Sequence, residues 1–160
     1  MSPERPAPRL LHSNAEPAAV SGISWAVGAN QLDSYTPGDA PLLGTTENYG
    51  WTVTIEMDDS RLSGRYETNQ NIDQYLSTAA LKSGVGMLTN EGGSWAVEFH
   101  GFTPPTGNEY IAYLTGEGGY EGLSAMLVSR PSAYGRWAME GVIYPGVLPE
   151  PPAWVLPPAE

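Results

Sequence analysis

The residues that most often carry enzymatic chemistry are scarce in this chain. Cysteine is absent, and the two histidines are His12, in a proline-rich segment, and His100, which is expected on an outer strand face. No Gly-x-Ser-x-Gly motif is present to position a serine nucleophile. Two distant histidines do not supply the ligands of a zinc site, and Asp58-Asp59 is more typical of a turn than of a carboxylate metal site. The sequence therefore predicts no cofactor, no metal and no nucleophilic catalysis.

A glycine-rich run, Gly116-Glu-Gly-Gly-Tyr-Glu-Gly122, invites comparison with nucleotide-binding loops. Glu121 stands where the third glycine of a dinucleotide loop would fall, and no helix pattern follows to offer its N-terminus to a phosphate. Glycine also permits the positive φ angles that sharp corners require. The run therefore predicts a corner between two strands.

The polar groups that remain are phenols and amides within otherwise apolar segments. Tyr66, Gln70 and Tyr110 are the candidate catalytic residues, because each would place a hydrogen-bonding group among apolar neighbours. A phenol or amide in such surroundings could donate to a carbonyl or hydroxyl of a bound molecule and polarise it. This chemistry needs no charged acid–base pair. It needs a fold that turns these side chains toward an enclosed space.

Alternation of apolar and polar residues indicates the elements to which these side chains belong. The run from Trp51 to Met57 alternates in this way, and Asp58-Asp59-Ser60 follows it as a turn. Similar runs recur about eight times, separated by turn sequences such as Asn90-Glu91-Gly92-Gly93. Such strands predict a single all-β domain, a closed eight-stranded antiparallel up-and-down β-barrel, with a β-sandwich as the alternative.

The expected position of charged residues outside the barrel determines which side chains face inward. Glu98 outside places Trp95 and Phe99 inside, and Lys82 outside makes Val85 and Met87 internal. The same reasoning on the other strands gives the candidate substrate-binding wall: Trp51, Met57, Met87, Trp95, Phe99, Leu114, Trp137 and Met139.

An eight-stranded barrel is just wide enough to be filled by its own side chains or to hold one small ligand. Gly64, Thr68 and Ala112 are small residues at expected inward positions and could leave space between the aromatic rings. Mainly apolar walls with a few polar groups are typical of ligand sites. We therefore expect a hydrophobic small molecule in the lumen, with a solidly packed interior as the alternative. Residues 123–130 are apolar on both faces, and their orientation stays open.

Proline-rich segments flank the strands. Residues 1–19 are expected to form a flexible N-terminal tail, residues 20–146 the barrel, and residues 147–160 a proline-rich C-terminal tail in a disordered or extended state. Trp154 and its apolar neighbours could fold back over a barrel mouth, contact a partner or stay disordered.

Charge and hydropathy restrict the partners. Eighteen acidic residues against seven basic ones give a net charge of −11. Such a surface repels phosphate backbones and anionic lipids, so nucleic-acid binding and membrane binding are disfavoured. No apolar run reaches the roughly 20 residues that span a bilayer, and the N-terminal segment lacks the apolar core of a signal peptide. A cytoplasmic location is expected, and a homodimer stays open.

Four segments give the chain a family resemblance. In order, they are Arg61-Leu-Ser-Gly-Arg-Tyr-Glu-Thr68, Leu88-Thr-Asn-Glu-Gly-Gly-Ser-Trp95, Gly116-Glu-Gly-Gly-Tyr-Glu-Gly-Leu123 and Glu140-Gly-Val-Ile-Tyr-Pro-Gly146. They resemble bacterial members of the allene oxide cyclase-like β-barrel superfamily, which includes spirotetronate cyclases of the Diels–Alderase type. The resemblance implies an eight-stranded barrel with a hydrophobic lumen that steers a reactive substrate into one cyclised product. It carries over no catalytic residues.

Two functions are compatible with these patterns. The first is a cofactor-independent cyclase or isomerase that folds a flexible polyketide-like or polyene-like substrate for ring closure, such as a Diels–Alder-type cycloaddition, in natural-product biosynthesis. The second is a non-catalytic barrel that carries a lipophilic small molecule. The same lumen would serve both.

Overall fold

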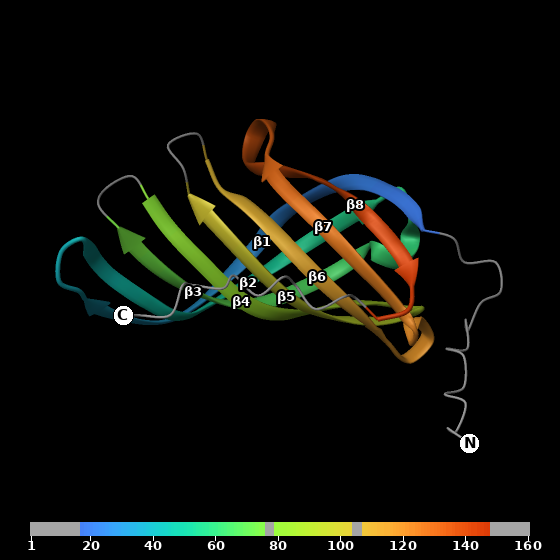
Figure 1. Cartoon of the computed structure of the whole chain (residues 1–160), viewed down its shortest axis with the longest axis horizontal. Helices are drawn as coiled ribbons and strands as arrows, with labels where there is room; N and C mark the ends of the chain where they lie inside the picture. The colour runs from blue at the N-terminus through green and yellow to red at the C-terminus, as the bar shows by residue number, and fades with distance from the viewer. Residues whose placement is uncertain (1–16, 76–78, 104–106, 148–160) are drawn as a thin grey trace, which may run out of the picture.

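The chain forms one closed antiparallel barrel in the computed structural model, which describes residues 17–75, 79–103 and 107–147 (Figure 1). Each strand pairs with the next in sequence, and β8 pairs back with β1. The strands are β1 (Ala18–Pro37), β2 (Leu42–Met57), β3 (Gly64–Tyr75), β4 (Ala79–Asn90), β5 (Gly93–Thr103), β6 (Glu109–Glu117), β7 (Leu123–Pro131) and β8 (Arg136–Pro145). The predicted all-β, eight-stranded up-and-down barrel is confirmed.

Among the residues that the structure describes, three short 3-10 helices lie in the connections: η1 (Ser60–Leu62), η2 (Gly118–Tyr120) and η3 (Ala133–Gly135). The Asp59 carboxylate caps η1 by accepting a hydrogen bond from the Arg61 backbone N–H, as befits a turn residue. Within the described ranges, no helix has the length and apolar character needed to cross a bilayer.

The glycine-rich run forms the predicted corner between β6 and β7. Gly118 has a φ of 60° and Gly122 a φ of 87°, both in the left-handed region that favours glycine. A Cβ atom on Gly119 would overlap the carbonyl oxygen of Gly92, in the β4–β5 hairpin. The corner therefore needs glycine both for its backbone angles and for its close approach to that hairpin.

The barrel begins slightly earlier than the expected boundary at residue 20. β1 starts at Ala18, which pairs with Ile143 of β8. Residues 1–16 and 148–160 lie outside the described residues. The expectations for these parts of the two tails, and for Trp154, therefore stay predictions.

One end of the barrel is closed by a packed plug, which we call the closed end and define by the buried residues Leu62, Leu88, Trp95, Leu114 and Tyr120. Trp95 is fully buried, stacks on Tyr120 with 5.2 Å between ring centroids, and donates its Nε1–H to the Arg61 carbonyl at 2.8 Å. Tyr120 in turn donates to the Asn90 Oδ1 at 2.6 Å. These contacts tie η1, η2 and the β4–β5 hairpin together, and Figure 1 shows these three segments at the same end of the barrel. The core of the molecule therefore sits at one end of the lumen.

Candidate functional site

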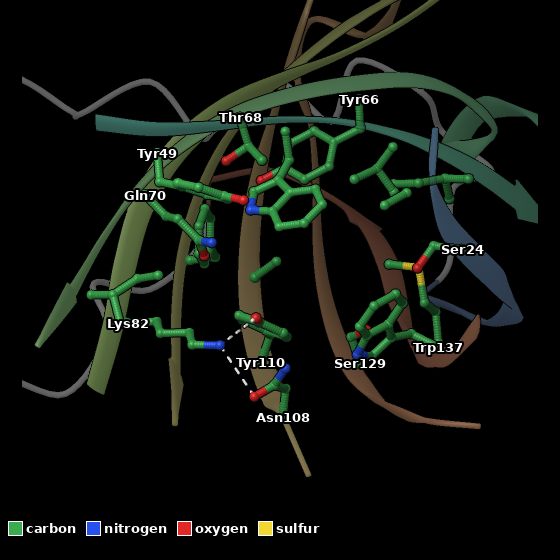
Figure 2. Close-up of a pocket in the computed structure, with 18 residues that line it drawn as sticks. Ser24, Tyr49, Tyr66, Thr68, Gln70, Lys82, Asn108, Tyr110, Ser129 and Trp137 are labelled. Carbon is green, nitrogen blue, oxygen red and sulfur yellow. Dashed lines mark hydrogen bonds between the residues drawn. The ribbon is translucent and has the colours of Figure 1, made fainter. Parts of the chain in front are cut away.

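The remaining lumen contains a cavity of about 380 Å³, and all eight strands contribute to its wall (Figure 2). This volume falls within the roughly 300–1,000 Å³ of small-molecule pockets. The wall is mainly apolar and aromatic, and its polar groups gather in a few places. The interior is therefore not solidly packed.

Most of the predicted site residues lie on this wall. The three candidate catalytic residues, Tyr66, Gln70 and Tyr110, all border the cavity. The predicted wall residues that do so are Trp51, Phe99, Trp137 and Met139. Inward orientation of alternate residues on β2, β3, β5, β6 and β8 accounts for this agreement.

Three predicted wall residues face inward or pack against the core without bordering the cavity. Trp95 and Leu114 belong to the closed end, where they are 0% and 1% exposed. Met57, at the last position of β2, is partly buried and packs against the core. The prediction that these three residues border the cavity is wrong, because alternation predicts which face a residue occupies but not its height along the barrel axis.

The prediction that Met87 and Val85 face inward is wrong, because both lie on the outer face of β4. Met87 is 40% exposed, and with Val85 it borders a shallow hollow on the outside of the barrel. The inner face of β4 instead carries Lys82, Gly84, Gly86 and Leu88. The prediction placed Lys82 outside because of its charge, and that choice reversed the orientation of the whole strand.

Lys82 is the centre of the main polar group on the wall, which we call the lysine cluster and define as Lys82, Asn108 and Tyr110. The Lys82 Nζ donates to the Asn108 Oδ1 at 3.1 Å and to the Tyr110 hydroxyl at 3.3 Å (Figure 2). It also lies 5.6 Å from the centroid of the Tyr110 ring. The Asn108 Oδ1 accepts a second hydrogen bond from the Thr103 hydroxyl at 2.6 Å. The cluster therefore fixes an ammonium group at the cavity wall.

Gly101 of β5, which lies between β4 and β6, makes the contact between Lys82 and Tyr110 possible. Lys82 of β4 pairs with Gly101 of β5, which pairs with Tyr110 of β6. A Cβ atom on Gly101 would overlap the Tyr110 ring. The missing side chain therefore leaves room for the Tyr110 ring beside Gly101, where Lys82 reaches its hydroxyl.

Glycines that lie against aromatic rings keep the lumen open at two further positions. A Cβ atom on Gly84 would come within 2.6 Å of the Phe99 ring, and one on Gly86 would overlap the Tyr66 ring. Covering glycines with aromatic rings is a known way to stabilise a curved sheet. Here it presses the rings against the wall instead of across the lumen. Thr68 and Ala112 border the cavity as expected, whereas Gly64, also expected to leave space, does not.

Burial shifts the ionisation of the groups on the wall. Desolvation raises the pKa of Tyr66 to about 12, with a hydrogen bond to Thr68 acting in the opposite direction, and raises the pKa of Tyr110 to about 12. Both phenols therefore keep their protons at neutral pH. Desolvation lowers the pKa of Lys82, because burial disfavours its charged form.

The charge of Lys82 has no anionic partner on the described part of the wall. No aspartate or glutamate is among the described residues that border the cavity. Among the described residues there is also no group of three or more histidine, cysteine, aspartate or glutamate side chains able to hold a metal ion.

Trp137 adds an unused donor on a part of the wall that lies away from the lysine cluster in Figure 2. Its indole Nε1–H is buried and has no hydrogen-bond partner among the described residues. A buried donor left unpaired costs free energy. It is therefore a position where an acceptor atom of a bound molecule would be stabilised.

Sequence reasoning missed Lys82, Asn108 and the unpaired donor of Trp137. A usable signal for Lys82 exists, because it is the chain's only lysine and alternates with Gly84 and Gly86, which are suited to a crowded inner face. Asn108 gives no such signal, since it precedes β6 in a turn-like sequence.

Comparison with known proteins supports the fold alone. No family model matches the chain, and no curated protein matches it. The barrel is similar to the crystal structure of a protein of unknown function from the DUF3224 family of Shewanella oneidensis MR-1. That similarity has a TM-score of 0.64 at 13% sequence identity and covers 83% of this chain and 100% of the other.

Proposed function

We propose that the barrel binds one flexible apolar molecule in its lumen and promotes its ring closure or isomerisation without a cofactor. The observation that supports this proposal is the open cavity, in which apolar aromatic walls face a small set of fixed hydrogen-bond donors. A polyketide-like or polyene-like chain closing by a Diels–Alder-type cycloaddition would suit these walls. The motif resemblance to allene oxide cyclase-like barrels favours the same chemistry.

The walls would act by restricting the substrate. Trp51, Phe99 and Trp137 offer rigid apolar surfaces around a narrow space. Holding a flexible chain close to its reactive geometry lowers a barrier by up to about 7–11 kcal/mol in well-oriented reactions. This contribution needs no acid, base or metal.

The donors would act on the electronics of the substrate. Tyr110 accepts a hydrogen bond from Lys82, which leaves its own O–H free to donate toward the lumen. A donor fixed in an apolar site polarises a substrate carbonyl more strongly than one in water. Tyr110, polarised by the ammonium group, is the donor we assign to the polar end of the substrate, and Tyr66 and Gln70, which line the same cavity, are the donors we assign to its carbonyl.

The alternative is a non-catalytic carrier of a lipophilic molecule. The observation that favours it is the closed end, where Trp95 and Leu62 are fully buried and make the barrel a cup sealed on one side. A cup of this kind retains a ligand whether or not it transforms it.

Turnover of linear polyenes tests the proposal. We would incubate the protein with a panel of linear polyenes that carry a carbonyl group and follow the products by mass spectrometry and chiral chromatography. Wild-type protein should give one cyclised stereoisomer faster than buffer, and Tyr110→Phe or Trp137→Ala should lower the rate at least tenfold with a smaller effect on stability. Tyr113→Phe, which changes an outward-facing tyrosine on the same strand as Tyr110, is the matched control. Binding without conversion across the panel would favour the carrier.

A further inference from the structure

We infer that the molecule taken up by this lumen carries a carboxylate, which binds Lys82 and Tyr110 while its apolar chain lies along the aromatic walls. This inference rests on the proposed function, since it names the class of molecule for the same cavity. It comes from the contacts of Lys82 with Asn108 and Tyr110, and neither the sequence nor the comparisons assign a role to Lys82 or Asn108.

The donors of the lysine cluster are only partly used. An ammonium group has three N–H bonds, and Lys82 directs two of them to Asn108 and Tyr110. One N–H is therefore left for a ligand, and the Tyr110 O–H is also free because that oxygen accepts from Lys82. The two donor atoms lie 3.3 Å apart. Two donors at this spacing suit the two oxygen atoms of one carboxylate.

The charge on the wall also calls for an anion. Lys82 is partly buried, and its contacts with Asn108 and Tyr110 are with neutral groups. Tyr66 and Tyr110, the phenols of the wall with raised pKa values, stay protonated at neutral pH and bring no negative charge. A buried charge without an opposite partner is costly, and a hydrogen-bonded counter-charge offsets that cost. A carboxylate would supply both the charge and the acceptor oxygens.

The rest of the cavity suits the other part of such a molecule. Away from the lysine cluster, the wall is formed mainly by apolar side chains such as Val53, Ile55 and Met139. A neutral hydrocarbon would fill this part but leave Lys82 without a counter-charge. A molecule with one acidic end and one apolar end matches both regions.

A matched set of probes tests the inference. We would measure binding of decanoate, decanol, methyl decanoate and decylamine to the whole chain by quenching of tryptophan fluorescence at neutral pH. Decanoate should bind at least about tenfold more tightly than decanol, which is the effect of one charge-assisted hydrogen bond. Decylamine should bind more weakly than decanol, because its cation would meet Lys82.

Variants of Lys82 test whether this residue causes the preference for decanoate over decanol. Lys82→Met should reduce decanoate affinity at least about tenfold and leave decanol affinity unchanged, whereas Lys82→Arg should keep the preference. Arg65→Met removes one positive charge from the outer face of β3, where Arg65 pairs with Glu67, and should change neither affinity. Circular dichroism would verify that each variant is folded.

The outcomes separate the inference from the proposed function. Equal binding of decanol and decanoate, or a decanoate preference that survives in Lys82→Met, would overturn the carboxylate inference and leave lumen binding intact. If none of the four probes binds and a panel of larger apolar molecules also fails, the proposed function falls and the inference with it. If Lys82→Met does not fold, loss of the decanoate preference on acetylation of this single lysine, with decanol affinity kept, supports the inference and its retention overturns it.

Discussion

A partly buried ammonium group and two partly buried phenols share one cavity wall, and the same loss of solvent shifts the pKa of all three. Desolvation favours the neutral form of every ionisable group, so it lowers the pKa of Lys82 and raises that of Tyr66 and Tyr110. The phenols are therefore reliable donors over the whole neutral range. The charged form of Lys82 costs free energy, because the group is partly desolvated. A bound anion would therefore stabilise this charge more than it would affect the other wall residues.

Alkaline pH should destabilise the fold through these phenols. Their pKa rises from about 10 in the unfolded chain to about 12 in the folded one, so the folded state retains protons that the unfolded state loses. The stability they contribute is complete below pH 10 and is lost as pH rises through about 12. Lys82, with its lowered pKa, acts in the opposite direction below its ordinary value of 10.5. Denaturant unfolding at a series of pH values would measure the loss.

Phenylalanine variants isolate this effect. The variant with Tyr66→Phe and Tyr110→Phe should lose less stability between pH 10 and 12 than wild type does. Tyr134→Phe is the control, because Tyr134 is 99% exposed. If the double variant and wild type lose the same free energy of unfolding between pH 10 and 12, burial of these two groups does not cause the raised pKa values.

Two tryptophans should respond differently to replacement by phenylalanine. Trp95 is fully buried and donates to the Arg61 carbonyl, so Trp95→Phe loses a hydrogen bond and leaves a cavity, at a cost of about 2–4 kcal/mol. The Trp137 Nε1–H has no partner among the described residues, so Trp137→Phe removes an unpaired buried donor and should cost less than about 1 kcal/mol. Denaturant unfolding of the two variants compares them directly, and a larger loss for Trp137→Phe would show that its indole donor is satisfied in solution.

At the scale of single strands, β4 shows what the sequence can and cannot predict. The alternating pattern correctly predicts strands and hairpins such as Asn90 to Gly93, because pleating and turn chemistry are local. It fails for the orientation of β4, because Lys82 is a charged residue on the inner face. The rule that charges face water holds for structural residues, and a functional site is where it is expected to break. Val85, which was expected to face inward, therefore lies on the outer face and is 62% exposed.

The glycine on β5 offers a test of how this sheet positions the lysine cluster. In Gly101→Ala the added methyl group would push the Tyr110 ring into the lumen and separate its hydroxyl from Lys82. We expect a stability loss of about 1–3 kcal/mol, as for other overpacked sites, and at least a tenfold weaker binding of decanoate. Gly28→Ala is the control, since nothing lies within 4 Å of its added Cβ atom. Unchanged decanoate affinity in a folded Gly101→Ala protein would show that the ring position does not matter.

At the scale of the whole molecule, the barrel divides its interior into a solid half and a hollow half. Alternation predicts the inner face of most strands, but not which inner residues meet at the closed end, because that depends on the strand tilt and on where η1 and η2 fold back. Trp95 and Trp137 both face inward, yet only Trp137 borders the cavity. The sequence predicted a hollow lumen, with a solidly packed interior as the alternative, and the cavity agrees with the first of these. The polar anchor of the cavity was not predicted, because it depends on Lys82 reaching over Gly101 of the neighbouring strand to Tyr110.

The charge of the whole chain opposes the entry of an anionic ligand, even though the cavity wall favours it once bound. A net charge of −11 repels a carboxylate at long range, and salt screens such repulsion, since the Debye length is about 10 Å at 0.1 M ionic strength. The association rate constant of decanoate should therefore rise severalfold from low to high sodium chloride concentration. Decanol, which carries no charge, is the control for any general strengthening of apolar binding by salt. Stopped-flow tryptophan fluorescence measures both rates, and a decanoate rate that falls as salt increases would mean that positive charge near the entrance, rather than the acidic surface, governs the approach of the ligand.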